Sequence, residues 1–154
     1  MERARQIKKM DNRLSKRLAD IVNALPLKKD IRVLEIGCGP GSMAREISKR
    51  IGKGNVLAID RSSKAIQQAI TGSKSEIESG RICFKQVAVQ DFELEPNEKR
   101  FDIAVAVRVG ALDGRHPEIE KQALIRIAKA VKENGKLFID GGDPWKEISL
   151  ERFR

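Results

Sequence analysis

The sequence is poor in the residues that build disulfide frameworks and base-stacking surfaces. Its 154 residues include two cysteines, no tyrosine, five phenylalanines and one tryptophan. Cys38 and Cys83 lie far apart and have no partners at metal-ligand spacing, so we expect neither a disulfide scaffold nor a metal site. Most of the aromatic residues fall in segments that are typical of strands. This argues against the exposed stacking platforms that bind single-stranded nucleic acid.

Long apolar runs are also missing. No segment approaches the roughly 20 apolar residues of a membrane-spanning helix, and the charged N-terminus lacks the apolar core of a signal peptide. We therefore expect a cytoplasmic protein with reduced cysteines and no membrane partner. Hydrophobic residues make up 40% of the chain, in alternating strand and helix patterns. This pattern indicates one α/β domain over residues 1–154.

The most informative segment is residues 31–41, which read Ile-Arg-Val-Leu-Glu-Ile-Gly-Cys-Gly-Pro-Gly. A short apolar strand carries the acidic Glu35, three alternating glycines follow, and apolar residues at helical spacing come next. In a strand, tight turn and helix of this kind, backbone N–H groups face a nucleotide-like ligand. The glycines let the backbone adopt positive φ and approach that ligand closely.

The spacing of the glycines separates two classes of nucleotide-binding turn. The dinucleotide pattern G-x-G-x-x-G would need glycine at position 42, where this chain has Ser42. The segment instead resembles motif I of the class I S-adenosylmethionine-dependent methyltransferases. A purely structural strand-to-helix turn remains the alternative, since many parallel sheets carry a glycine-rich turn. The resemblance implies that five residues of this segment contact the cofactor: Glu35, Gly37, Cys38, Gly39 and Gly41.

A second apolar strand, residues 55–60, ends in Asp60. An acidic residue at this distance from the first glycine suits two neighbouring ribose hydroxyls, because one carboxylate accepts from both. We include Arg61, the next residue, in the same cofactor site. The alternative for Asp60 is to cap the following helix, although Ser62 or Ser63 can do so.

Residues 101–109 and 135–140 resemble the fourth and fifth strands of the methyltransferase core, so the resemblance covers about residues 31–142. It implies a Rossmann-like open parallel sheet of strand order 3-2-1-4-5 with helices on both faces. We expect a short helix over 144–153, no C-terminal strand hairpin, and a fifth strand at the sheet edge. An open edge strand promotes association, which makes a homodimer possible.

The third strand departs from the family pattern. Where relatives often have an acidic residue that receives the adenine amino group, this chain has Ala88. We expect the backbone of Val89 and apolar stacking to hold the adenine. The alternatives for Asp91 are an adenine contact and an ordinary loop or cap residue.

The loop after the fourth strand holds a polar cluster. Arg108 is predicted to bind the methionine carboxylate of the cofactor or an acidic group of the substrate; an ion pair with Glu35 or Asp113 is the alternative. His116 is the sole histidine and precedes Pro117, which suits the first position of a helix over 117–132. We predict catalytic roles for His116, as proton acceptor, and Asp113, while a helix cap is the alternative for His116.

Residues 1–25 carry an excess of basic residues and apolar residues at three- and four-residue steps, which predicts a basic amphipathic helix. It either docks on the domain with a solvated basic face or contacts phosphates or a membrane surface, since the net charge of +9 favours polyanions.

The predicted function is S-adenosylmethionine-dependent methyl transfer to an unidentified acceptor. A small molecule is favoured over nucleic acid, because the loop after the fourth strand has neither an Asn/Asp-Pro-Pro-aromatic run nor a cysteine. The alternative is a non-catalytic cofactor-binding or regulatory module that contacts a partner or nucleic acid through its basic N-terminal helix.

Overall fold

The structure is a computed structural model that describes residues 16–154. The larger part of the predicted basic helix, residues 1–15, lies outside the described residues. Its remainder forms a helix over 16–23, and both Val22 and Leu25 are buried. No helix among the described residues is long and apolar enough to cross a membrane.

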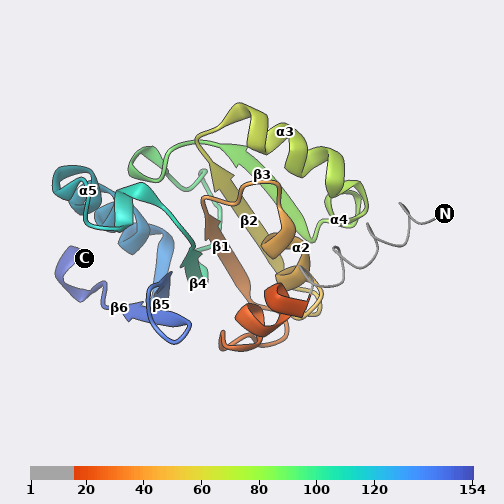
Figure 1. Cartoon of the computed structure of the whole chain (residues 1–154), viewed down its shortest axis with the longest axis horizontal. Coiled ribbons are helices and arrows are strands. Elements are labelled where there is room, and N and C mark those ends of the chain that lie inside the picture. The colour runs from red at the N-terminus through yellow and green to blue at the C-terminus, as the bar shows by residue number, and fades with distance from the viewer. Residues whose placement is uncertain (1–15) are drawn as a thin grey trace.

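Helices and strands alternate along the chain, as the sequence predicts (Figure 1). Three short 3-10 turns lie between them or at the end: η1 (Val89–Asp91), η2 (Gly110–Leu112) and η3 (Glu151–Phe153). The main elements are β1 (Arg32–Ile36), α2 (Ser42–Ser48), β2 (Asn55–Asp60), α3 (Ser63–Gly72), α4 (Lys74–Glu78), β3 (Ile82–Gln86), β4 (Phe101–Ala106), α5 (Pro117–Ala130), β5 (Val131–Asp140) and β6 (Trp145–Ile148).

The strands form one sheet in the order β3-β2-β1-β4-β5-β6. The pairs from β3 through β5 are parallel, which confirms the predicted order 3-2-1-4-5. The central strand β1 pairs with both β2 and β4, and its last four residues are buried. This register brings the carboxyl ends of β1, β2 and β4 to one edge of the sheet, where open α/β sheets bind ligands.

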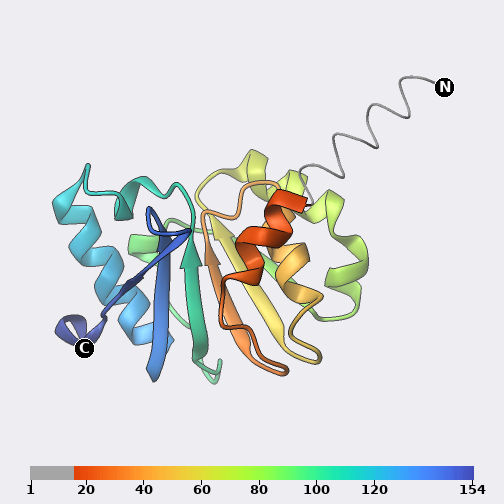
Figure 2. The ribbon, with the colours of Figure 1, turned by 60° about the horizontal axis from the view of Figure 1, so that its bottom comes forward.

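Helices cover both faces of the sheet (Figure 2). Leu34 and Ile36 of β1 belong to the core under α5, whereas Val33 belongs to the core shared with α2, α3 and the helix over 16–23. Side chains of a strand alternate between faces, so Glu35 lies on the same face as Val33. Its side chain is therefore directed to the α2 layer, where it is buried.

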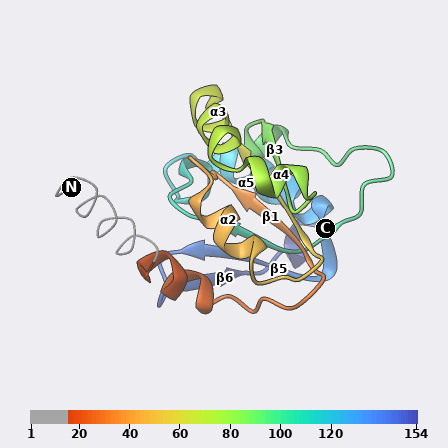
Figure 3. The ribbon, with the colours of Figure 1, turned by 90° about the vertical axis from the view of Figure 1, so that its right-hand side faces the viewer.

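The C-terminal segment corrects two predictions. Residues 144–153 do not form a helix: β6 pairs antiparallel with β5, with Leu137 opposite Ile148 and Ile139 opposite Lys146 (Figure 3). The fifth strand is therefore not at the edge, which removes the reason given for a homodimer. Trp145 and Ile148 pack on opposite faces of the sheet. Residues three positions apart lie on opposite faces of a strand, whereas in the predicted helix they would lie on the same side.

Candidate functional site

The glycine turn after β1 is fastened to the end of β2. The N–H groups of Gly37 and Cys38 both donate to the carbonyl oxygen of Ile59, at 2.8 and 3.0 Å. Gly37 has φ +71°, and a Cβ there would lie 2.8 Å from Cγ2 of Val109. Gly39 has φ +54° but faces open space, with no atom within 4 Å of a Cβ built on it. The turn is therefore tight against the loop after β4 and open at its middle glycine.

Asp60 connects this turn to the start of α3. One carboxylate oxygen accepts from the N–H of Gly39 and the other from the N–H of Ser62, both at 2.9 Å. The cap of α3 is Ser62, whose hydroxyl accepts from the N–H of Ala65 at 3.2 Å. The capping alternative for Asp60 is therefore not what the structure shows. A carboxylate has about four acceptor positions, so each oxygen of Asp60 retains one.

A cavity of about 520 Å³ lies at the carboxyl ends of β1, β2 and β4. We call it the β2–β4 cavity. Its volume is within the usual range of ligand pockets. Of the predicted site residues, Glu35, Cys38, Gly39 and Gly41 do not line it. Seven predicted residues do line it: Gly37, Asp60, Arg61, Ala88, Val89, Arg108 and His116.

Glu35 lies beneath the turn as a buried acid. Its side chain is only 3% exposed, and its Oε2 atom has no hydrogen-bond partner among the described residues. Burial raises the pKa of Glu35 to about 8, against the attraction of Arg45, and the nearby Asp60 raises it further. Burial, together with Glu35, also raises the pKa of Cys38 to about 12, so this thiol stays neutral at physiological pH.

The segment that follows β3 is the one in which Val89 is predicted to hold the adenine. Val89 is buried at the start of η1 and lines the β2–β4 cavity, as does Gln90. Asp91 is exposed, its N–H donates to the oxygen of Ala88 at 2.9 Å, and it does not line the cavity. This geometry favours Val89 over Asp91. Sequence reasoning missed Gln90, whose only signal was its place beside Val89.

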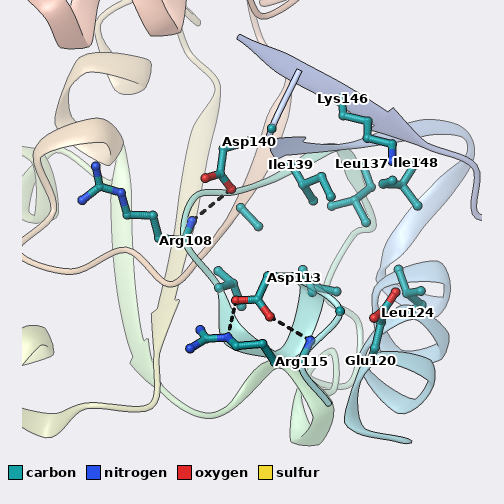
Figure 4. Close-up of a pocket in the computed structure, with 15 residues that line it drawn as sticks. Arg108, Asp113, Arg115, Glu120, Leu124, Leu137, Ile139, Asp140, Lys146 and Ile148 are labelled. Atoms are coloured by element: carbon teal, nitrogen blue, oxygen red, sulfur yellow. Dashed lines mark hydrogen bonds and ion pairs between the residues drawn. The ribbon is translucent and has the colours of Figure 1, made fainter. Parts of the chain in front are cut away.

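A second cavity, of about 650 Å³, lies beside the ends of β4 and β5, between α5 and β6 (Figure 4). We call it the β4–β6 cavity. Arg108, Val109 and Arg115 line both cavities, so the two adjoin. Asp113 lines only the β4–β6 cavity, whereas His116 lines only the β2–β4 cavity. The two predicted catalytic side chains are therefore not brought together in one cavity.

Asp113 is engaged by its neighbour Arg115, whose main-chain N–H and Nε donate to its two carboxylate oxygens at 3.1 and 2.7 Å. The backbone hydrogen bond from Arg115 is the main cause that holds the pKa of Asp113 below its usual value. His116 occupies the N-cap position of α5, with Pro117 at the first helical position, but its side chain makes no cap hydrogen bond. The imidazole is therefore not engaged in capping.

Arg108 lies two residues after the end of β4 and has a left-handed conformation, with φ 55°. Its main-chain N–H donates to Oδ1 of Asp140 at 3.0 Å (Figure 4). Within residues 16–154, no acidic side chain lies within ion-pair distance of its guanidinium, so the predicted alternative pairs with Glu35 or Asp113 are not formed. Sequence reasoning missed Asp140, although an acidic residue at a strand end was the signal that identified Asp60.

No group of three or more His, Cys, Asp or Glu side chains in the described part of the chain has the arrangement of a metal site.

Comparisons with known proteins identify the family of this chain. The model of the family "Methyltransferase domain" matches residues 33–135. A Bacillus subtilis protein named "Putative methyltransferase YrhH" is 26% identical over 62 residues, which is 40% of this chain and 34% of that protein.

Two solved structures illustrate the range of relatives. The Haemonchus contortus phosphoethanolamine N-methyltransferase 2, in complex with phosphomonomethylethanolamine and S-adenosylhomocysteine, is 26% identical with a TM-score of 0.64, over 80% of this chain and 27% of that one. The cyclase SpnF is 25% identical with a TM-score of 0.64, over 80% of this chain and 43% of that one.

The chain thus spans less than half the length of these relatives. The family match nevertheless covers most of the chain and includes the glycine turn, the strand that ends in Asp60, and β4. By this match and by its fold, the chain belongs to the class I S-adenosylmethionine-dependent methyltransferase family.

Proposed function

We propose that this protein binds S-adenosylmethionine in the β2–β4 cavity and transfers its methyl group to a small-molecule acceptor in the β4–β6 cavity. The observation that carries the proposal is Asp60, whose two oxygens each keep an acceptor position beside a glycine turn that is open at Gly39. These two acceptor positions match the two hydrogen bonds that adjacent ribose hydroxyls can donate.

The other residues of the cavity fit the remaining parts of the same molecule. Val89 and Ala88 offer an apolar wall for the adenine, with Gln90 beside them. The guanidinium of Arg108, which has no acidic partner among the described residues, suits the methionine carboxylate. The residues present therefore fit S-adenosylmethionine. Cys38 and Glu35 are buried and do not line the cavity.

S-adenosylmethionine supplies an electrophilic methyl group on its sulfonium when bound. The contribution of the protein is alignment and exclusion of water: the two cavities adjoin at Arg108, Val109 and Arg115. His116 is the proposed proton acceptor for acceptors that must lose a proton, because an imidazole nitrogen can accept a proton and this side chain makes no cap hydrogen bond.

Calorimetry tests this proposal directly. S-adenosylmethionine and S-adenosylhomocysteine should each bind the purified protein at one site, and NAD should not, since position 42 lacks the third glycine of the dinucleotide pattern. Tight NAD binding without a response to S-adenosylhomocysteine would exclude the proposed function.

A second candidate is a binding or regulatory module that holds the cofactor without turning it over. The net charge of +9 favours a polyanionic partner for such a module. Binding of S-adenosylmethionine without methyl transfer, together with a salt-dependent shift of RNA in a gel, would support this candidate over the enzyme.

A further inference from the structure

The β4–β6 cavity has apolar walls and acidic polar groups. Its apolar side chains come from three elements, with Leu124 on α5, Leu137 on β5 and Ile148 on β6. Figure 4 shows the carboxylates of Asp113, Glu120 and Asp140 around this space, whereas the guanidinium groups of Arg108 and Arg115 extend away from it on one side. The two arginines also line the β2–β4 cavity. Both arginines also line the β4–β6 cavity: the guanidinium of Arg108 extends away from Asp140, and that of Arg115 binds Asp113.

The three carboxylates differ in what already binds them. Both oxygens of Asp113 accept from Arg115. Among the described residues, Asp140 accepts only from the main-chain N–H of Arg108, through Oδ1, which leaves Oδ2 available. Neither Asp140 nor Glu120 has a cationic partner within 4 Å in the part of the chain that the structure describes. The cavity thus has two unneutralised acids, opposed by the exposed Lys146 at its β6 side.

We propose that the acceptor held in this cavity is a primary or secondary amine with an apolar body, and that Asp140 binds its nitrogen. This inference rests on the proposed function, which makes the cavity the acceptor site. An anionic acceptor would meet two like charges, which disfavours it relative to a cationic one. A protonated amine forms a charge-assisted hydrogen bond with Asp140, while its apolar body is buried against Leu124, Leu137 and Ile148.

Asp140 is better placed than Glu120 for this role. It ends β5 directly beside Arg108, where the two cavities adjoin, whereas Glu120 lies on α5 near Leu124. A nitrogen held at Asp140 is therefore at the boundary with the proposed cofactor cavity. For transfer, the ammonium first loses a proton, for which His116 is the proposed acceptor. The nitrogen lone pair then forms the N–C bond, the C–S bonding pair returns to sulfur, and the surplus proton on nitrogen passes to water.

The test measures binding as well as turnover. Protein saturated with S-adenosylhomocysteine is titrated in a calorimeter with a series of arylalkyl amines, beginning with phenethylamine, and with the matched carboxylates and alcohols. We expect the amines to bind and the carboxylates not to bind. With S-adenosylmethionine present, mass spectrometry should detect a methyl group on the amine nitrogen.

Two variants with the same change of charge locate the site. Asp140→Asn keeps an oxygen for the N–H of Arg108 but removes the charge, so it should weaken amine binding by about tenfold or more and leave S-adenosylhomocysteine affinity unchanged. Glu147→Gln removes a charge from β6 outside both cavities, where Glu147 pairs with Lys136 at 3.4 Å. It should leave amine affinity unchanged.

The outcomes separate the two proposals. Failure to bind S-adenosylhomocysteine would refute the proposed function and this inference with it. If S-adenosylhomocysteine binds normally, three results would each refute the amine site alone. These are no binding of the amines, binding of carboxylates or alcohols as well as the amines, and full amine affinity in Asp140→Asn.

Discussion

The indole Nε1 of Trp145 donates a hydrogen bond of 2.9 Å to the main-chain oxygen of Ile21, across 124 positions of sequence. This bond joins β6 to the helix over 16–23, which lies beside α2 on the same face of the sheet (Figure 2). Next to it, Val22 is fully buried and Leu25 is 6% exposed. Residues 16–25 therefore dock on the domain through Val22 and Leu25, as the docking interpretation of the apolar stripe predicts.

Removal of residues 1–22 should lower the free energy of unfolding or cause aggregation, because it deletes Val22 from the core and leaves the indole of Trp145 without its acceptor. Urea denaturation and size-exclusion chromatography measure both effects. Removal of residues 1–15 alone keeps both contacts and serves as the control. If the chain without residues 1–22 stays monomeric and equally stable, the segment is a recognition tail.

Asp60→Ala should weaken S-adenosylhomocysteine binding by about 1.5–3 kcal/mol, the scale of hydrogen bonds to a charged group. Calorimetry at constant pH measures the change. Asp91→Ala is the matched control, because Asp91 is exposed and does not line the β2–β4 cavity. Equal losses in the two variants would contradict a ribose contact at Asp60.

Gly39→Val should abolish S-adenosylhomocysteine binding, since its side chain would fill the open space above the turn. Valine at a positive φ also lowers stability through backbone strain, so a control for this effect is needed. Gly80→Val serves, because Gly80 has φ +78°, has open space around it and lies between α4 and β3, far along the chain from the turn. Both variants should lose similar stability, but only Gly39→Val should lose the ligand. Retained binding in a folded Gly39→Val protein would exclude a ligand over the turn.

Glu35 should make the protein less stable as the pH rises. Its pKa is about 8 in the folded state against an ordinary value of 4.5, so between these values the folded state holds a proton that the unfolded chain has lost. Stability therefore falls with increasing pH over this interval, by at most about 1.4 kcal/mol per pH unit.

Glu35→Gln should remove this slope and exceed the parent stability at pH 8 by on the order of 4 kcal/mol, with little difference at pH 4.5. Denaturant titrations across the pH range give the comparison. Glu78→Gln, at an exposed position on α4, should leave the slope intact. An unchanged slope in Glu35→Gln would show that Glu35 ionises normally in the folded protein.

His116→Ala should lower methyl transfer while cofactor affinity stays nearly the same, because its imidazole makes no cap hydrogen bond at the start of α5. The rate of amine methylation and the affinity for S-adenosylhomocysteine, measured by calorimetry, are compared in the two proteins. If turnover and affinity fall together, His116 shapes the β2–β4 cavity instead of accepting a proton.

The sequence by itself determined the parallel order of the first five strands and the position of the glycine turn. These features are local, because the apolar runs, the alternating glycines and Asp60 can each be recognised from a few neighbouring residues. Asp60 could be placed beside the turn because parallel strands bring their carboxyl ends to one edge. Ser62, likewise, could be identified as a helix cap from its own position.

Only the tertiary structure decided which side chains meet. Trp145 and Ile148 fit a helix by their spacing, but in the structure they belong to a strand that pairs with β5. As a strand, this segment packs one side chain against the apolar cluster on each face of the sheet, which one short helix could not do. Arg108 has two potential acidic partners in the sequence and pairs with neither, because Arg115 engages Asp113 and Glu35 lies in the α2 layer. Burial, ion pairing and the separation of the two cavities depend on contacts between distant segments, which residue spacing does not encode.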